Sequence, residues 1–208
     1  MTEKTTYNNV PISNPLASEI ADLSSIQYDF DYVRDCAKEL LNGNHRNETI
    51  SRSLWIAGAI MYRRPFTNGT AQVISQGPRF KLPKQWIDEL DADLRSAHEE
   101  ILEWANLQVA HHIGLKETYQ VDALVNPDGM DRGFASTIVS HTIEILPDPK
   151  LIRALQTLSV RFAEKSRGLR MEKTIQQREA LKDADVNDFY DDPKKFFAKG
   201  KRGPRFNS

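Results

Sequence analysis

The sequence lacks most of the features that would place the protein in a membrane or outside the cell. Cys36 is the only cysteine among 208 residues, so a disulfide framework within the chain is excluded. No segment approaches the ~18 uninterrupted apolar residues of a membrane-spanning helix. The first residues, "MTEKTTYNNVPISNP", have neither the basic nor the apolar region of a secretion signal. These absences predict a cytoplasmic protein without a membrane span.

An excess of charge of one sign is also missing. The 28 Lys and Arg residues are balanced by 29 Asp and Glu residues, so the net charge is -1. This balance gives no overall attraction to nucleic acid or to an anionic membrane, and any such attraction has to be local. The length suits one domain with a sizeable core.

Patterns typical of metal ligation are absent as well. The chain has no HExxH spacing and no CxxC pair. His98 adjoins Glu99 and Glu100, but it lies about 20 Å from His111 along an ideal helix, so the two imidazoles cannot share one ion within a subunit. The sequence therefore predicts no metal site and no cofactor.

Apolar residues that recur at spacings of three and four predict four amphipathic helices. Asparagine or proline begins three of them, and glycine or proline ends three. The predicted helices begin near Ile26, Asn47, Pro83 and Pro147 and end at Gly43, at Pro65, at Gly114 and near Ala184, in that order.

Two segments between the third and the last predicted helix have the composition of strands. "TYQVDALV" and "STIVSHTIEI" are separated by "NPDGMDRG", which is rich in turn-forming residues, so we expect one antiparallel hairpin. In the second strand His141 alternates with Val139 and Ile143, which predicts a packed histidine on an apolar face.

Together these elements predict a mainly α fold, a bundle of about four helices with a β-hairpin inserted before a long C-terminal helix. Residues 1–24 are polar and interrupted by prolines, which predicts a flexible N-terminal arm. Residues 25–184 form the helical domain, and residues 185–208 form a basic tail that we expect to be disordered. The last helix exceeds 30 residues, so its distal half is expected to project, to pair with another subunit or to fray.

The basic tail is a candidate RNA-binding segment. Its last sixteen residues contain six cations, no carboxylate side chain and three phenylalanines, which suit phosphate contacts and base stacking. A solvated chain end is the alternative interpretation. The cations are Lys194, Lys195, Lys199, Lys201, Arg202 and Arg205.

Two adjacent histidines, His111 and His112, end the third predicted helix. A helix C-terminus stabilises imidazolium, so packing and dipole compensation explain them in one interpretation. Imidazole also titrates near neutral pH and can move a proton, which makes a catalytic role the other interpretation.

The segment "LRSAHEEILEWANLQVAHHIG" resembles the central helix of HEPN-type proteins. In that family an arginine, usually followed by a polar residue such as asparagine, precedes a histidine by four to six residues, and Ala-His closes the motif. Asn106 and Ala110-His111 match, whereas Ala105 stands in place of the arginine. The segment "YRRPFT" and a hairpin before a long last helix are similar too, so the resemblance covers residues 25 to 182.

The resemblance implies a metal-independent ribonuclease. The histidine would act as a base on a ribose 2′-hydroxyl, and the arginine would stabilise the charge that develops on the phosphate. Loss of one preorganised donor typically costs about 10²–10³ in rate, so activity is expected to be weak or absent unless another cation replaces it. Arg64 is the candidate replacement in this chain, and His111, Asn106 and His112 form the rest of the variant centre.

The resemblance also implies partners. These are RNA, a second copy of the chain in a homodimer and an antitoxin protein, in the setting of bacterial defence or of a toxin–antitoxin system. Exposed stripes on the third and last predicted helices would supply the dimer interface. The competing hypothesis is a non-catalytic helical dimerisation or interaction module without RNA activity.

Overall fold

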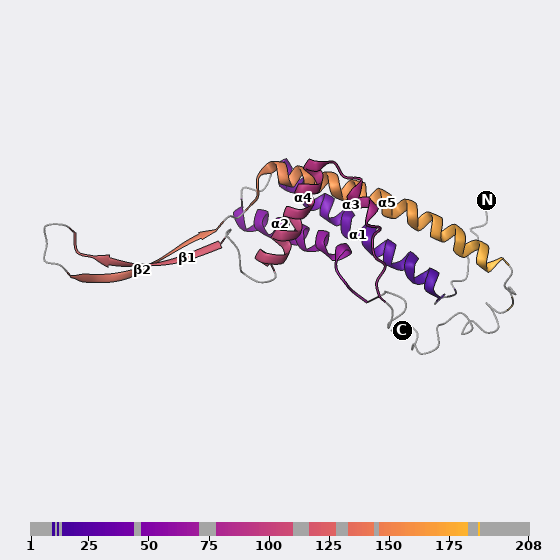
Figure 1. The fold of residues 1–208 in the computed structure, drawn as a ribbon, viewed down its shortest axis with the longest axis horizontal. Helices are drawn as coiled ribbons and strands as arrows, with labels where there is room; N and C mark the ends of the chain where they lie inside the picture. Colours follow the sequence, from indigo (N-terminus) through magenta and orange to yellow (C-terminus); the bar gives the residue numbers. More distant parts are fainter. Residues whose placement is uncertain are drawn as a thin grey trace, which may run out of the picture.

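The predicted helical bundle with a hairpin before a long last helix is confirmed by the computed structural model, which describes residues 10, 12, 14–43, 47–70, 78–109, 117–127, 133–143, 146–182 and 187. Helices dominate these ranges, and two strands interrupt them (Figure 1). The elements are α1 (Pro15–Asn42), α2 (Glu48–Arg63), the 3-10 helix η1 (Arg64–Phe66), α3 (Gln85–Asp88), α4 (Ala92–Glu103), the π-helix η2 (Trp104–Val109), β1 (Glu117–Val125), β2 (Phe134–Ile143) and α5 (Pro149–Leu181).

Helix α1 begins earlier than its apolar pattern predicted. The side chain of Asn14 accepts a hydrogen bond from a backbone N–H of the first turn, and Pro15 occupies the first helical position. Residues 15–24, which we expected in the flexible arm, are therefore helical. The apolar pattern missed them because Ser18 and Asp22 are polar residues at buried positions.

Helices α1 and α5 pack along one another and form the spine of the bundle (Figure 1). The contact extends far along α5, where Lys173 forms an ion pair with Glu19 of α1 at 2.9 Å. The distal half of α5 therefore lies against α1 through this region, because α1 is longer than expected. None of the helices in the described ranges, α5 included, has the length and apolar character needed to cross a membrane.

The third predicted helix is broken into three parts, α3, α4 and η2. Asp91 lies between α3 and α4, and its carboxylate accepts a hydrogen bond from the backbone N–H of Leu94 at 2.8 Å. An aspartate in this role favours a helix start, so it interrupts a helix that the apolar spacing alone would continue.

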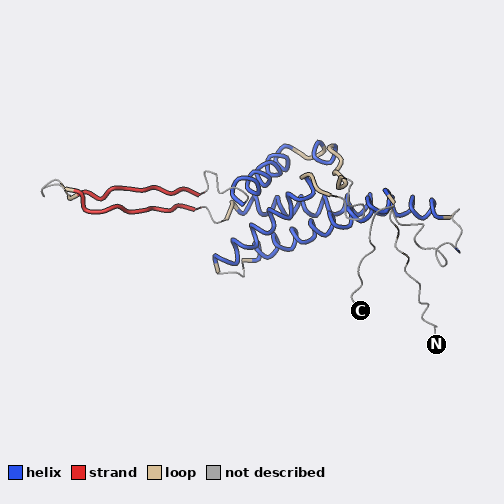
Figure 2. The backbone as a smooth tube through the Cα atoms, turned by 90° about the horizontal axis from the view of Figure 1, so that it is seen from below, coloured by secondary structure: helices blue, strands red, loops and turns tan. Residues whose placement is uncertain are grey.

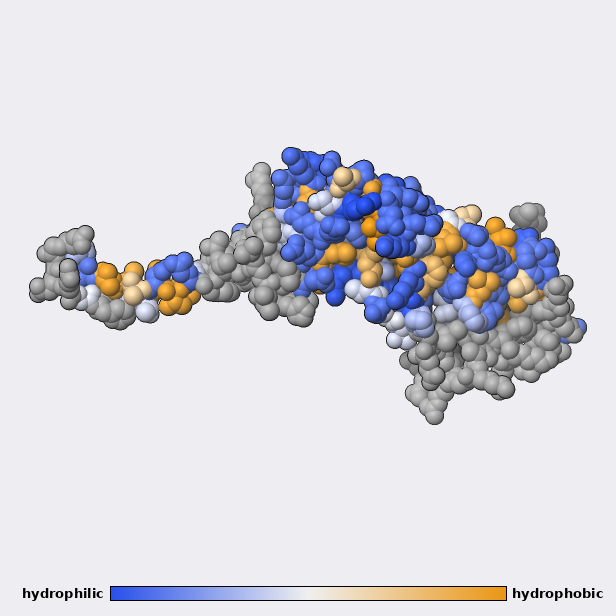
Figure 3. Space-filling model, in the orientation of Figure 1, coloured by the Kyte–Doolittle hydropathy of each residue, from blue (hydrophilic) through white to orange (hydrophobic). Residues whose placement is uncertain are grey.

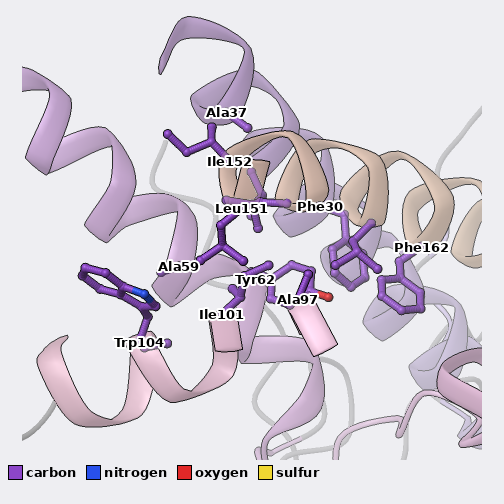
Figure 4. Packing of buried hydrophobic residues seen from close by; sticks show 14 of the residues in the cluster. Phe30, Ala37, Ala59, Tyr62, Ala97, Ile101, Trp104, Leu151, Ile152 and Phe162 are labelled. Carbon is purple, nitrogen blue, oxygen red and sulfur yellow. The ribbon is translucent and has the colours of Figure 1, made fainter. Parts of the chain in front are cut away.

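Aromatic rings fill the centre of the core (Figure 4). The ring of Phe162 on α5 lies 5.4 Å from that of Phe30 and 5.5 Å from that of Phe66, between centroids. Tyr62 and His98 complete the group. Large rings bury much apolar area each, so this cluster joins α1, α2, α4 and α5 into one core.

The hairpin projects away from the end of the bundle (Figure 2). Its strands pair in antiparallel register, with Val121 opposite Val139, and neither strand packs substantially on a helix. These two valines are 67% and 62% exposed, so the strand face that was expected to pack is open to solvent at Val139. For His141 the structure describes the backbone, paired with Tyr119, and its side chain lies outside the described part.

Replacing Phe162 with alanine should destabilise the protein strongly. The side chain is fully buried among four rings, and large-to-small changes at such sites cost about 3–5 kcal/mol. Chemical denaturation of purified protein would measure this loss. Val160→Ala on the exposed side of α5 is the control and should change the free energy of unfolding by less than about 0.5 kcal/mol. Equal effects of the two variants would contradict the assigned core.

Candidate functional site

The structure places two of the predicted site residues, Asn106 and Arg64. The others lie outside the described residues, so their predicted roles stay predictions. They are His111, His112, Lys194, Lys195, Lys199, Lys201, Arg202 and Arg205.

Asn106 lies in η2, where the α-helical hydrogen-bond pattern gives way to six π-helical residues. Its side chain is half-buried, whereas the preceding Trp104 packs edge-on against Trp55 with ring centroids 5.5 Å apart. The π-helix is rare and occurs frequently at functional sites, because its wider turn costs stability. The irregular turn therefore coincides with the segment that resembles the HEPN motif.

Ala105 faces the core. Its side chain is almost fully buried, as part of the same hydrophobic cluster as Trp104. An arginine at this position would have to bury its charge in the described conformation, which is costly without a partner. Ala105, which stands where the resemblance would place an arginine, is thus a packing position in the described structure.

Arg64 begins η1 directly after α2 and is engaged in an ion pair. Its Nη1 lies 3.0 Å from Oδ1 of Asp29, and Arg79 binds the other oxygen of the same carboxylate at 3.3 Å. The Asp29 side chain is 1% exposed and that of Arg79 is 8% exposed, whereas that of Arg64 is 44% exposed. Arg64 therefore contacts the buried acid from the surface, and part of its guanidinium faces solvent.

Burial raises the pKa of Asp29 above its usual range, and the charges of Arg64 and Arg79 lower it again only in part. Arg79 also donates to the backbone carbonyl of Arg64 and to Ser25 Oγ, both at 3.3 Å. These bonds attach the segment that precedes α3 to α1 and η1. No sequence pattern indicated this cluster, because Asp29 and Arg79 come from distant segments that no local spacing relates.

A second polar contact lies inside the aromatic core. The hydroxyl of Tyr62 and Nδ1 of His98 are 2.8 Å apart, and Phe66 stands edge-on to the imidazole at 4.7 Å between centroids. Burial lowers the pKa of His98, with a smaller opposing effect of Glu99, and burial raises the pKa of Tyr62 well above its usual value. Both groups are therefore neutral near pH 7, and His98 serves the core rather than a surface reaction.

The charged residues along one open groove on the described surface are mainly acidic. This groove of about 480 Å³ runs between α4 and the start of α5, and three carboxylates and one lysine lie along it. Within the described ranges, no group of three or more His, Cys, Asp or Glu side chains could hold a metal ion. The acidic residues that line this groove do not suit an anionic ligand.

Comparison with models of known protein families, with curated proteins and with solved structures finds no match. The function therefore has to be inferred from the residues and geometry of this chain.

Arg79 and Arg64 bind the same carboxylate, yet their replacement should have unequal effects. Arg79→Ala removes a buried partner of a buried charge, which should cost about 3 kcal/mol. Arg64→Ala removes a largely exposed partner and should cost roughly 1 kcal/mol or less. Denaturant unfolding at neutral pH would compare the two variants. A larger loss for Arg64→Ala would show that the exposed arginine is the main partner of Asp29.

The pH dependence of stability should report on His98. In the folded protein its pKa lies below the unfolded value of about 6.5, so its stabilising effect is complete above that pH. As the pH falls below about 6.5 the unfolded chain gains a proton first, and stability should drop by at most about 1.4 kcal/mol per pH unit.

The double variant Tyr62→Phe/His98→Phe keeps an aromatic ring at both positions and removes the titrating group together with its hydrogen-bond partner. Subtracting its pH profile of unfolding free energy from that of the wild type isolates His98 from the other four histidines. Parallel profiles would rule out the effect assigned to His98.

Proposed function

We propose that this chain is an RNA-associated protein of bacterial defence or of a toxin–antitoxin system, with a variant ribonuclease centre of weak or no activity. The observation that carries the proposal is the π-helix η2, which holds Asn106 and ends two residues before His111 in the sequence. Irregular turns of this kind are rare and occur frequently at functional sites. A binding or catalytic site would therefore explain the π-helix in the segment around Asn106.

The same geometry supports weak or absent catalysis. Ala105 supplies no cation and is buried, and Arg64 already donates to Asp29. His111 would retain the role of base, but the charge that develops on the phosphate would lack its stabilising guanidinium. A second subunit of a homodimer could supply such a cation, and the basic tail would contribute contacts to RNA phosphates.

The second candidate is a non-catalytic interaction module without RNA activity. A specific observation favours it, because the hairpin exposes apolar side chains on an arm that leaves the bundle (Figure 3). Surfaces of this kind commonly bind other proteins.

RNA binding and cleavage can be measured separately on one purified protein. We expect binding of structured RNA that weakens as salt rises, because cations contact phosphates. In the presence of chelator we expect little cleavage, and His111→Ala should remove what there is. His45→Ala is the matched control for loss of a histidine outside the motif.

Three results distinguish the hypotheses. Salt-sensitive binding with weak or no cleavage supports the proposal. Strong chelator-resistant cleavage that His111→Ala removes would show that another cation completes the centre, and Arg64→Ala would then test whether Arg64 is that cation. If the protein neither binds nor cleaves RNA, the proposal is excluded and the interaction module is the function that is left.

A further inference from the structure

In the described part of the chain, no further strand pairs with either edge of the hairpin, and one of its faces is largely apolar. In the pairing register, residues 121, 123, 137 and 139 share a face, and Val121 and Val139 lie opposite each other on it. A two-stranded hairpin is at best marginally stable in water, whereas three or more strands with an apolar face are stable. Additional strands at an edge would therefore stabilise the arm.

The charges along the two strands indicate that the hairpin binds protein rather than nucleic acid. Neither β1 nor β2 contains lysine or arginine, and β1 contains Glu117 and Asp122. A ribbon that binds nucleic acid needs cations to neutralise phosphates, so this arm does not suit a polyanion.

The two edges of the hairpin also differ in charge. The sequence of β2 is "FASTIVSHTI", which is rich in β-branched residues and has no carboxylate, whereas β1 has two. Charged residues on an edge strand oppose pairing with another strand, and their absence permits it. The edge of β2 is thus the one open to another strand, and an uncharged strand can pair with its own copy without repulsion between like charges.

We propose that β2 pairs antiparallel with β2 of a second copy of this chain. The product is a continuous sheet of four strands in the order β1-β2-β2-β1, related by a two-fold axis. The apolar faces of the two hairpins then lie on the same side of one sheet. This sheet has more than three strands and an apolar face, which is what a stable sheet needs and a single hairpin lacks.

The alternation of strand side chains restricts the register. Residues directly opposite one another in an antiparallel pair share a face, so a residue must pair with one of the same parity in its copy. Full overlap of Phe134–Ile143 would centre the axis between residues 138 and 139 and would break this rule. The nearest allowed registers place either Ile138 or Val139 opposite itself.

This association should be weak and dependent on concentration. The nine residues paired in either allowed register bury on the order of 300 Å² per copy from the strand dimensions, or about 600 Å² in total. This total is about half of the ~1,200 Å² that specific stable interfaces bury at the least. The inference rests on the hairpin alone and does not depend on the proposed RNA function.

Single cysteines test the pairing directly, on the full chain with the buried Cys36 changed to alanine. One of Ile138→Cys and Val139→Cys should form a disulfide-linked dimer on mild oxidation, because residues opposite themselves have Cβ atoms about 5 Å apart. The matched controls are Leu124→Cys and Val121→Cys on β1. Leu124 is 45% exposed against 46% for Ile138, and Val121 is as exposed as Val139. Three strand spacings separate the controls from their copies by about 14 Å, too far for a disulfide.

Sedimentation velocity of the wild type over a concentration series should show a monomer–dimer equilibrium, and circular dichroism would verify that each variant folds. A wild type that stays monomeric at high concentration would overturn the proposal. Cross-linking of the β1 controls alone would also overturn it, because that result would assign the interface to the other edge. A wild-type dimer in which neither β2 cysteine cross-links would overturn it as well. Cross-linking at β2 without RNA affinity would exclude the proposed function and leave this inference intact.

Discussion

The burial of α5 against α1 is the contact on which the rest of the structure depends. These helices are the longest in the chain and come from opposite ends of the described sequence, yet they pack along one another. Helices of this length gain most of their stability from such packing rather than from intrinsic propensity. Phe162 of α5 and Phe30 of α1 then provide the ring surface against which α2 and α4 close.

Two polar contacts are built into this apolar interior, and each places a constraint on function. Asp29 is satisfied by two arginines, and one of them is Arg64, the candidate replacement cation. His98 is satisfied by Tyr62 and enclosed by rings. Buried groups of this kind are costly unless paired, so their partners are committed to the fold. His98 is therefore committed to the core, whereas Arg64 is held by Asp29 and keeps part of its guanidinium exposed to solvent.

The functional hypotheses draw on two different irregularities of an otherwise regular bundle. The π-helix η2 distorts the motif segment around Asn106 and supports the RNA-associated proposal. The projecting hairpin exposes apolar side chains and supports self-association. The two proposals are compatible in one protein, because they rest on different segments of the chain.

Local patterns in the sequence determined the helical class, the position of the hairpin and the long last helix, because side-chain spacing of 3.6 or 2 residues reflects which face is buried. The same patterns missed the first turns of α1, where Ser18 and Asp22 are buried, and the break at Asp91. They identified Arg64 and Asn106 as candidates but not the environment of either residue. Only the tertiary structure brought Asp29 to Arg79 and Tyr62 to His98, because these contacts join segments that no local periodicity relates. The same holds for the burial of Ala105 in the core.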